Sequence, residues 1–335
     1  MPGGITLNGG VSFSGGFTFT EAPPIENTAA WFAGGGQDAA VFWRSTVQRI
    51  TFATDTATAS ERGPLSGTMQ YLAAASNFTD GWFGAGQIGA DGGAGSRVDR
   101  ITYATDTATA SVRGPLSQAR AYSAAAGNTT NAWFGGGALY STVDRITYAT
   151  DTATASVRGP LSVAKLSSGA AGNATDTWFS GGEASGSSQL STVDRITYAT
   201  DTATAAVRGP LSLSRSRLAA AGNSDYGWFG GGNTGGNGGS GSFSIIDRIT
   251  YATDTATASV RGPLSGARYA LAAAGNSDYG WFGGGGDPAV PTPYGPTIST
   301  VIHRITYATD TATASVRGPL SSGRTALAAA GGVHY

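Results

Sequence analysis

The chain has 335 residues, of which 53 are glycine; only 12% are charged, and the formal net charge is -1 at pH 7. A near-neutral chain without a basic cluster argues against nucleic acid as the main partner, because phosphate binding needs clustered Lys and Arg. Cysteine is absent, and His303 and His334 are the only histidines. This excludes disulfides, iron–sulfur clusters, thiolate nucleophiles and a multi-histidine metal site, so we expect neither a metal nor a cofactor.

Residues 1 to 28 are predicted to form a glycine-rich arm outside the repeated part of the chain. The first residues lack the basic segment and apolar run of a signal peptide, and no apolar stretch is long enough to span a bilayer. We therefore expect a protein made in the cytoplasm, neither secreted by a signal peptide nor inserted into a membrane. Apolar residues alternate with Ser, Gly and Thr in the arm, as in a strand that adds to another subunit's sheet: Val11, Phe13, Phe17 and Phe19. The alternative is an extra strand folded against the chain's own rim.

From residue 29 onwards, one unit of about 50 residues recurs six times. Each copy begins with a Trp-Phe pair. Next comes Arg-Ile-Thr, followed by one Tyr or Phe and then Ala-Thr-Asp-Thr-Ala-Thr-Ala. The copy ends with Arg-Gly-Pro-Leu-Ser and an Ala-rich run. The tryptophans are Trp31, Trp82, Trp133, Trp178, Trp228 and Trp281. The arginines that open the second segment are Arg49, Arg100, Arg145, Arg195, Arg248 and Arg304. The positions shared by all copies are those that the repeated unit itself requires.

Each unit is predicted to form four short strands. Strand a is the Ala-rich run, strand b carries Trp-Phe-Gly-Gly-Gly, strand c is Val-Asp-Arg-Ile-Thr-Tyr, and strand d is Thr-Ala-Thr-Ala-Ser-Val-Arg. We expect the small residues of strand a to line a central channel, the Trp and Phe rings to pack between units, and the glycines to adopt positive φ. Asp106 and its equivalents are expected to bond nearby backbone amides in a tight turn. We expect the arginines present in every unit to make structural ion pairs or hydrogen bonds to the backbone. His303 stands where other units have the strand-c Asp, and we interpret it as a local variant without a catalytic role.

This order of segments resembles the kelch family over about residues 29 to 331. Kelch repeats have a strand that ends in paired glycines, here Gly135-Gly136, followed by an aromatic-containing strand and a turn similar to Ala149-Thr150-Asp151-Thr152. The chain departs from the family at strand d, where Ala153 replaces the usual Trp. The resemblance implies an all-β fold, a kelch-like β-propeller with six four-stranded blades over residues 29–335.

The two ends of the repeated part predict how the propeller closes. The chain enters at a strand b, Trp31-Phe32, and leaves after a strand a, Leu327 to Ala330. The C-terminal strand a should therefore complete the first blade and remove the open edges of the ring. We place the approximate starts of the a strands at Tyr71, Tyr122, Ser168, Leu218, Ala270 and Ala326.

The b–c and d–a loops should emerge at one end of the ring, and the b–c loops differ greatly among the copies. Variable loops on a rigid scaffold are where binding residues tend to lie. The b–c loops offer large side chains as candidates for ligand or receptor binding: Phe42, Trp43, Arg44, Tyr140, Phe243 and Tyr294. The d–a loops add cationic candidates: Arg120, Lys165, Arg215, Arg217, Arg268 and Arg324. A packing role inside an assembly, or drift after duplication, would explain the same variation.

No catalytic constellation stands out, and we expect no enzyme. Glycosidase chemistry needs two carboxylates a few ångströms apart, whereas the recurring aspartates occupy turns and strand starts common to all units. The Ser-x-Asp-x-Gly-x-Thr-Trp boxes of sialidase-type propellers are absent. The segment from Gly232 resembles calcium-binding repeats only superficially, because it has no Asp ligands, and Ala90 to Gly93 is too sparse for a calcium loop.

The near-identical units also resemble repeat proteins of tailed bacteriophages, especially cyanophages. The corresponding residues are Phe134 to Gly137, Thr142 to Asp144 and Ala149 to Ala155. The resemblance implies a non-enzymatic virion structural protein on a tail fibre, tail tip or capsid surface, with host-surface glycan or other virion proteins as partners and the arm as its anchor. A cellular kelch-like interaction module is the alternative, and a carbohydrate-active enzyme is a third hypothesis.

Overall fold

The computed structural model describes residues 28–37, 42–89, 92–235, 241–292 and 295–331. Within these ranges the chain consists of antiparallel strands, and the helical elements are 3-10 turns of three residues. None of the helical turns in the described ranges has the length and apolar character that crossing a membrane requires. The prediction of an all-β fold is confirmed.

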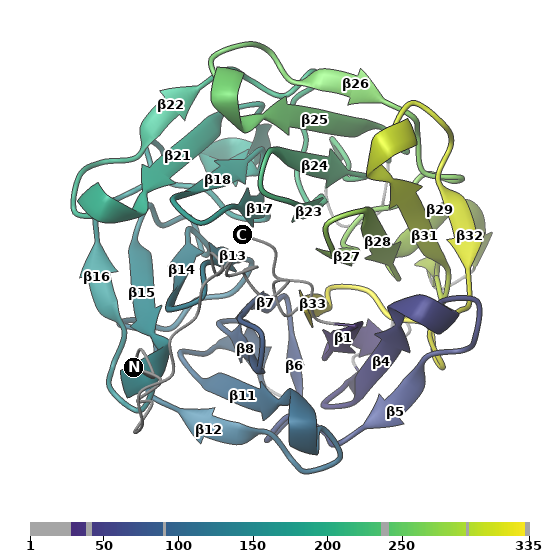
Figure 1. Ribbon diagram of the computed structural model, residues 1–335, viewed down its shortest axis with the longest axis horizontal. Coiled ribbons are helices and arrows are strands. Elements are labelled where there is room, and N and C mark those ends of the chain that lie inside the picture. The colour runs from purple at the N-terminus through teal and green to yellow at the C-terminus, as the bar shows by residue number, and fades with distance from the viewer. Residues whose placement is uncertain (1–27, 38–41, 90–91, 236–240, 293–294, 332–335) are drawn as a thin grey trace, which may run out of the picture.

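The described residues form six four-stranded sheets, which we call blades 1 to 6, each with the order a, b, c, d from the centre outwards (Figure 1). Blade 1 contains β33 (Ala328–Gly331), β1 (Ala29–Ala33), β4 (Val47–Thr51) and β5 (Ser60–Arg62). Blade 2 contains β7 (Ala73–Ser76), β8 (Asp80–Gly84), β11 (Val98–Thr102) and β12 (Ser111–Arg113). Blade 3 contains β13 (Ala124–Gly127), β14 (Asn131–Gly135), β15 (Val143–Thr147) and β16 (Ser156–Arg158).

The remaining three blades repeat the same arrangement. Blade 4 contains β17 (Gly169–Gly172), β18 (Asp176–Ser180), β21 (Val193–Thr197) and β22 (Ala206–Arg208). Blade 5 contains β23 (Ala219–Gly222), β24 (Tyr226–Gly230), β25 (Ile246–Thr250) and β26 (Ser259–Arg261). Blade 6 contains β27 (Ala272–Gly275), β28 (Tyr279–Gly283), β31 (Ile302–Thr306) and β32 (Ser315–Arg317).

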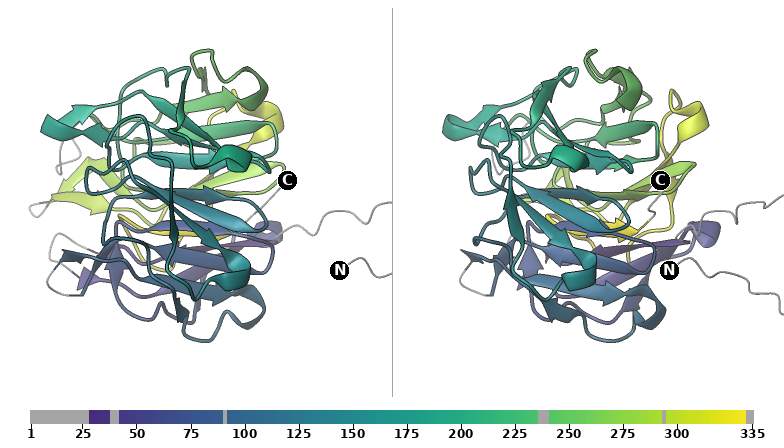
Figure 2. Two further views of the ribbon diagram at one scale, coloured as in Figure 1. Left: turned by 90° about the vertical axis from the view of Figure 1, so that its left-hand side faces the viewer. Right: turned by 60° about the vertical axis from the view of Figure 1, so that its left-hand side comes forward.

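Short elements connect these strands. A 3-10 turn follows strand c in every blade: η1 (Phe52–Thr54), η2 (Tyr103–Thr105), η3 (Tyr148–Thr150), η5 (Tyr198–Thr200), η6 (Tyr251–Thr253) and η7 (Tyr307–Thr309). The b–c loops carry small strands and a further turn: β2 (Gly36–Gln37), β3 (Phe42–Trp43), β9 (Gln87–Ile88), β10 (Gly93–Ala94), β19 (Glu183–Ala184), η4 (Ser185–Ser187), β20 (Ser188–Gln189), β29 (Gly286–Thr292) and β30 (Gly295–Ile298). β6 (Met69–Gln70) lies in a d–a loop and pairs with β9. The β29–β30 hairpin stands out beyond the sheets at one end of the molecule (Figure 2).

The innermost strands surround a common centre. The strands β7, β13, β17, β23, β27 and β33 contact one another in this order, and β33 also contacts β7 (Figure 1). β33 pairs antiparallel with β1, so that Ala330 lies opposite Trp31 and Ala328 opposite Ala33. Strands from the two ends of the described chain thus share one sheet. This arrangement of four-stranded sheets around an axis is a β-propeller.

Strand a lines the axis, as the small side chains predict. One end of the central channel is bordered by three consecutive residues of each strand a, among them Ala74 to Ser76 and Ala220 to Gly222. The a strands begin one or two residues later than expected, at Ala73 and Ala124 rather than at the tyrosines of blades 2 and 3. The tyrosines are excluded because they have positive φ, 54° for Tyr71 and 64° for Tyr122, which interrupts an extended strand.

A repeated polar cluster joins each blade to the next. In blade 2 the Trp82 indole Nε1 donates a 2.9 Å hydrogen bond to Asp151 of blade 3, and its ring stacks on Tyr148 at a centroid distance of 3.7 Å. Arg100 and Arg113 pair with the same carboxylate at 3.1 and 3.5 Å. The other junctions, including blade 6 to blade 1, repeat the pairing on Asp106, Asp201, Asp254, Asp310 and Asp55.

These contacts confirm two predictions and correct a third. The recurring arginines make structural ion pairs, and the tryptophans pack between blades, where a large ring buries much surface and its N–H needs a partner. The turn aspartates were expected to bond nearby backbone amides. Their carboxylates instead accept hydrogen bonds from the preceding blade, as Asp106 does from Trp31. The reason is that a buried indole N–H and two guanidinium groups approach the turn from outside it.

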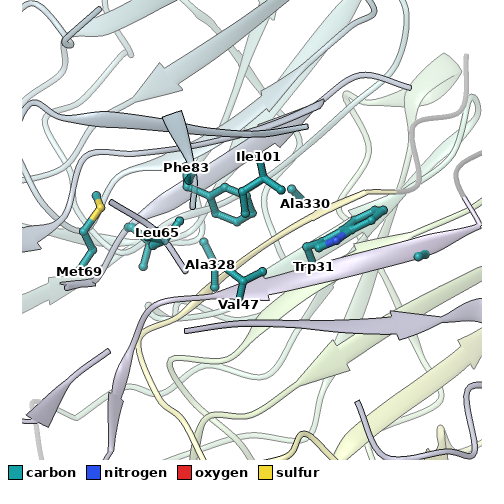
Figure 3. Packing of buried hydrophobic residues seen from close by; sticks show 12 residues of the cluster. Trp31, Val47, Leu65, Met69, Phe83, Ile101, Ala328 and Ala330 are labelled. Atoms are coloured by element: carbon teal, nitrogen blue, oxygen red, sulfur yellow. The ribbon is translucent and has the colours of Figure 1, made fainter. Parts of the chain in front are cut away.

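Apolar side chains fill the space between blades. Figure 3 shows the cluster between blades 1 and 2, in which Trp31, Val47 and Ala328 of blade 1 lie with Phe83 and Ile101 of blade 2. Strand c of blade 1 buries Val47 and Ile50, whereas Arg49 is half-buried and pairs with Asp106 in the polar cluster. Phe83 is fully buried, and burying a side chain of this size contributes about 2 kcal/mol relative to leaving it in water.

The glycines that follow the Trp-Phe pair are needed for their backbone conformation. Gly136 and Gly137 have φ of 66° and 90°, which L side chains rarely adopt. A β-carbon on Gly136 would also lie 2.8 Å from the carbonyl oxygen of Lys165. Glycine meets both requirements at this position, as predicted, although blade 2 has Ala85 there with a φ of 55°.

Candidate functional site at the axial mouth

The b–c and d–a loops lie together at one end of the propeller, as predicted. Isolated backbone bridges join them, for example between Leu166 and Glu183 and between Ser216 and Asn233. In blade 2 the two loops are joined by the pairing of β6 with β9. The Gln70 side chain there also donates a hydrogen bond to the Gln87 side chain. The loops are thereby held against the entrance of the central channel.

A closed ring of backbone hydrogen bonds surrounds this entrance. One residue of each d–a loop donates its N–H to the carbonyl oxygen of the equivalent residue in the preceding blade, over 2.7 to 2.9 Å. The six residues, in order around the axis, are Tyr71, Tyr122, Ser167, Arg217, Ala270 and Ala326, and Tyr71 donates to Ala326 to complete the circle. We call the pocket that they surround the axial mouth.

All six ring residues have positive φ, between 52° and 64°. For residues other than glycine this conformation costs on the order of 1 kcal/mol each, and it persists only where the surroundings require it. Here positive φ directs the N–H and carbonyl of each ring residue towards the neighbouring blades. These backbone groups therefore form hydrogen bonds although the ring residues lie outside the four-stranded sheets. The ring thus places six side chains around one axis at a fixed height.

These six side chains differ from blade to blade, although the strands beside them are nearly identical. Tyr71 and Tyr122 stack on each other with ring centroids 4.0 Å apart. Arg217 lies on the other side of the ring, between the small residues Ser167 and Ala270. The mouth therefore has an aromatic side and a side with one cation and more room.

The hydroxyls of Tyr122 and Tyr269 remain protonated at neutral pH. Burial raises the pKa of Tyr122, the neighbouring Tyr71 and the Glu183 carboxylate add to the rise, and the Arg217 guanidinium opposes it. Burial likewise raises the pKa of Tyr269, again against the effect of Arg217. The Arg217 charge thus acts on both Tyr122 and Tyr269, and the Glu183 charge acts on Tyr122. The residues that border the mouth itself include the stacked aromatic pair and the cationic side chain of Arg217.

The predicted loop candidates are spread over separate blades. Tyr140 is 44% exposed, and Arg44 is exposed and donates a hydrogen bond to Gln37. Trp43 is half-buried, and its ring lies so near Gly92 of the next b–c loop that a β-carbon there would be 3.3 Å away. Phe243 is half-buried and its backbone pairs with Arg268.

Other candidates fall outside the part of the chain that the structure describes. Tyr294 lies there, as does the side chain of Phe42, whose backbone belongs to β3. The anchor residues Val11, Phe13, Phe17 and Phe19 also lie there, and their role stays a prediction. Among the described candidates, Arg217 is the one that lines the axial mouth.

The structure corrects the placement of five cationic candidates. Arg120, Lys165 and Arg215 are fully buried. Each pairs at 2.9 to 3.0 Å with the strand-c Asp of the blade that follows its loop: Asp144, Asp194 and Asp247. Arg268 is 6% exposed and pairs with Asp287, and Arg324 is 1% exposed and donates to the carbonyl oxygens of Gly34 and Thr46. A buried charge needs such partners, so these side chains support the loop backbone and are not offered to a ligand.

Sequence reasoning missed Tyr71 and Tyr122 as members of the axial mouth. The residue two positions before strand a is Tyr, Tyr, Ser, Arg, Ala and Ala in successive copies, within a loop whose preceding position varies as well. The sequence does not show that this residue has positive φ, the conformation with which its side chain borders the axial mouth. In the described ranges, no group of three or more His, Cys, Asp or Glu residues gathers as metal ligands would.

Comparison with known proteins identifies the fold and not the family. No family model and no curated protein matches the chain. Among solved structures, the one titled "Structure of YjhT" matches with a TM-score of 0.64 and 12% sequence identity, over 79% of this chain and 89% of that chain. The match supports a β-propeller. Because 514 chains match in fold, the architecture by itself selects no function.

Proposed function

We propose that this chain is a non-enzymatic structural protein of a bacteriophage virion, on a tail fibre, tail tip or capsid surface. Its six blades form a closed kelch-like ring in this proposal, and the axial mouth, with the variable loops around it, binds a host-surface glycan. The resemblance of the repeats to tailed-phage proteins supports the virion role. The continuous contacts of the inner strands and the β33–β1 pairing support closure.

One observation carries the binding role: the ring position around the axial mouth holds different side chains in successive blades, whereas the strands a that follow it are nearly identical. The strands a that follow the ring have nearly the same small residues in every blade. The ring position holds two stacked tyrosines and an arginine instead, at backbone positions under strain. Strained, diversified positions on a rigid scaffold are typical of binding sites.

The composition of the mouth favours binding over catalysis. The twelve described residues that line it are Tyr, Ser, Arg, Leu and Ala, without a carboxylate pair that could act as general acid and base. Glu183 is the carboxylate that acts on Tyr122 from the adjoining loop. A polar rim with an aromatic surface is suited to hold a hydroxylated ligand without transforming it.

The purified chain is expected to bind glycans on an array and to compete with the phage for adsorption to host cells. Replacing both Tyr71 and Tyr122 by Ala should reduce glycan binding at least tenfold, because the aromatic surface is lost. Val157→Ala, at an exposed position of the outer strand β16, is the control and should bind as the unchanged chain does. If the chain bound no glycan and did not affect adsorption, the attachment role would be wrong.

The virion role is tested through the arm. We propose that residues 1 to 28 attach the propeller to another virion protein through their alternating apolar residues. Phage that encode a chain lacking residues 1 to 28 should produce particles without the propeller, while the purified truncated chain keeps its thermal unfolding transition. Unchanged incorporation of the truncated chain would contradict the anchor.

A further inference from the structure

The β29–β30 hairpin is the b–c loop of blade 6 and stands beyond the sheets (Figure 2). We call the paired residues where it leaves the blade the hairpin root: Gly286, Asp287, Thr297 and Ile298. The root is joined to the d–a loop that precedes blade 6. The Gly286 N–H donates to the carbonyl oxygen of Tyr269 over 2.9 Å, and the Asp287 carboxylate pairs with the Arg268 guanidinium at 2.6 Å. Two consecutive loop residues thus hold two consecutive residues of the root.

The cations at the position of Arg268 in the other d–a loops have different partners. Arg120, Lys165 and Arg215, which precede blades 3, 4 and 5, each pair with the strand-c Asp of that blade at 2.9 to 3.0 Å. Each also donates a 3.0 Å hydrogen bond to the carbonyl oxygen of the Phe in strand b. In these three blades the cation is therefore neutralised by the blade itself.

Blade 6 does not have this strand-c anion. His303 occupies the register position that Asp144 has in blade 3, opposite the Phe of strand b. Its Nδ1 lies 3.0 Å from the Ser265 hydroxyl, and Asp144 accepts a 2.9 Å hydrogen bond from the backbone N–H of the equivalent Ser117. The imidazole thus takes the place of the carboxylate without supplying a negative charge.

We infer that residue 303 determines whether the hairpin root is held: because His303 supplies no anion, Arg268 pairs with Asp287 of the hairpin. An Asp at position 303 would be buried, since His303 is 1% exposed, whereas the Asp287 side chain is 21% exposed. A buried carboxylate needs a cationic partner more than one that water can reach. Arg268 would therefore turn to residue 303, as the cations before blades 3 to 5 do, and the root would lose its ion pair. The inference does not depend on what the propeller binds.

The repeat supplies variants that this position tolerates. His303→Asp should fold, because three other blades have Asp there paired with the same loop cation. His303→Asn introduces a side chain of the same size without the charge and is the matched control. Asp287→Asn removes the anion of the hairpin and leaves position 303 unchanged. The double variant, His303→Asp with Asp287→Asn, tests whether both residues act through one ion pair, and thermal unfolding verifies that each variant is folded.

Hydrogen exchange, measured residue by residue by NMR on the full chain, reports the opening of the root. The Gly286 amide and the Ser299 amide, which donates to the carbonyl oxygen of Gly285 over 2.9 Å, are the probes. We expect both to exchange about tenfold faster in His303→Asp and in Asp287→Asn, because a charged interaction at the root is lost. His303→Asn should keep the rates of the unchanged chain, and the double variant should exchange no faster than either single variant.

Blade 4 provides the internal reference. The Glu183 N–H donates to the carbonyl oxygen of Leu166 over 2.8 Å, at the place where Gly286 bonds Tyr269 in blade 6. Its loop cation, Lys165, already pairs with Asp194. The exchange rate of Glu183 should therefore be the same in all variants.

Three results would overturn the inference. Unchanged exchange at Gly286 in His303→Asp would mean that Arg268 stays with Asp287. Equal acceleration by His303→Asn and His303→Asp would mean that loss of the imidazole, and not the new charge, loosens the root. Unchanged exchange in Asp287→Asn would show that the ion pair does not hold the hairpin, and this result requires no variant at position 303 to fold.

Discussion

At the residue scale, His303 shows how one substitution in the repeat changes the chemistry of a buried position. It replaces the strand-c Asp in blade 6, is 1% exposed, and its Nδ1 lies 3.0 Å from the Ser265 hydroxyl. Burial, together with the Arg268 guanidinium, lowers its pKa to about 4, and Asp287 opposes the shift. The imidazole is therefore neutral at pH 7 beside the buried Arg268.

This depressed pKa predicts a loss of stability in acid. Between pH 6.5 and about 4 the unfolded chain binds a proton at His303 and the native chain does not, so the free energy of unfolding falls as the pH falls through this range. The loss attributable to His303 amounts to about 3 kcal/mol at most. His303→Gln introduces the residue that blade 1 has there, Gln48, and should remove this component. Urea unfolding of both chains at pH 7, 5.5 and 4.5 measures it; equal pH dependence would contradict the assignment.

At the scale of elements, the junction between strand b of one blade and the 3-10 turn of the next is the repeated unit of cohesion. Strand order and the roles of Trp and Arg could be predicted, because the same residues recur in every copy. The hydrogen-bond partners of the turn carboxylate could not be predicted, because they lie in another blade. Asp151 accepts a hydrogen bond from Trp82, which precedes it by 69 residues. The composition of the turn predicted hydrogen bonds from nearby backbone amides to this carboxylate. In the structure its partners are instead Trp and Arg side chains of the preceding blade.

Asp151→Asn tests this junction. The amide can still accept from the Trp82 indole, but Arg100 and Arg113 lose their common anion, so we expect a loss of about 2 kcal/mol in the free energy of unfolding. Asp225→Asn is a suitable control, since Asp225 is exposed in an a–b turn. Guanidinium denaturation compares the three chains. A variant as stable as the parent would show that the cluster contributes little.

At the scale of the whole molecule, the pairing of β1 with β33 joins the two ends of the described chain. Without β33, blade 1 keeps three strands and the inner edge of β1 has no partner. An unpaired strand edge is a site for association with other chains. The contacts from β27 through β33 to β7 would be lost together with the pairing.

Deleting residues 326–335 should therefore lower stability by about 4 kcal/mol, counting about 1 kcal/mol for each of the four lost register pairs, and should cause association. Deleting only residues 332–335 leaves β33 intact and is the control. Thermal unfolding and sedimentation velocity measure the two effects. A monomeric deletion variant with unchanged unfolding temperature would argue against a closed ring.

The repeat, the four-strand pattern of each copy, the small residues at the axis and the end at which the variable loops gather can all be predicted from the sequence. These follow from periodicity and side-chain size, which are properties within one unit. Which loop side chains border the axial mouth became clear only from the tertiary structure. Arg120 and Arg217 both lie in d–a loops, yet Arg120 is buried against Asp144, while Arg217 borders the axial mouth. The difference arises from the ring of hydrogen bonds and its positive φ, because side-chain direction there depends on contacts between blades.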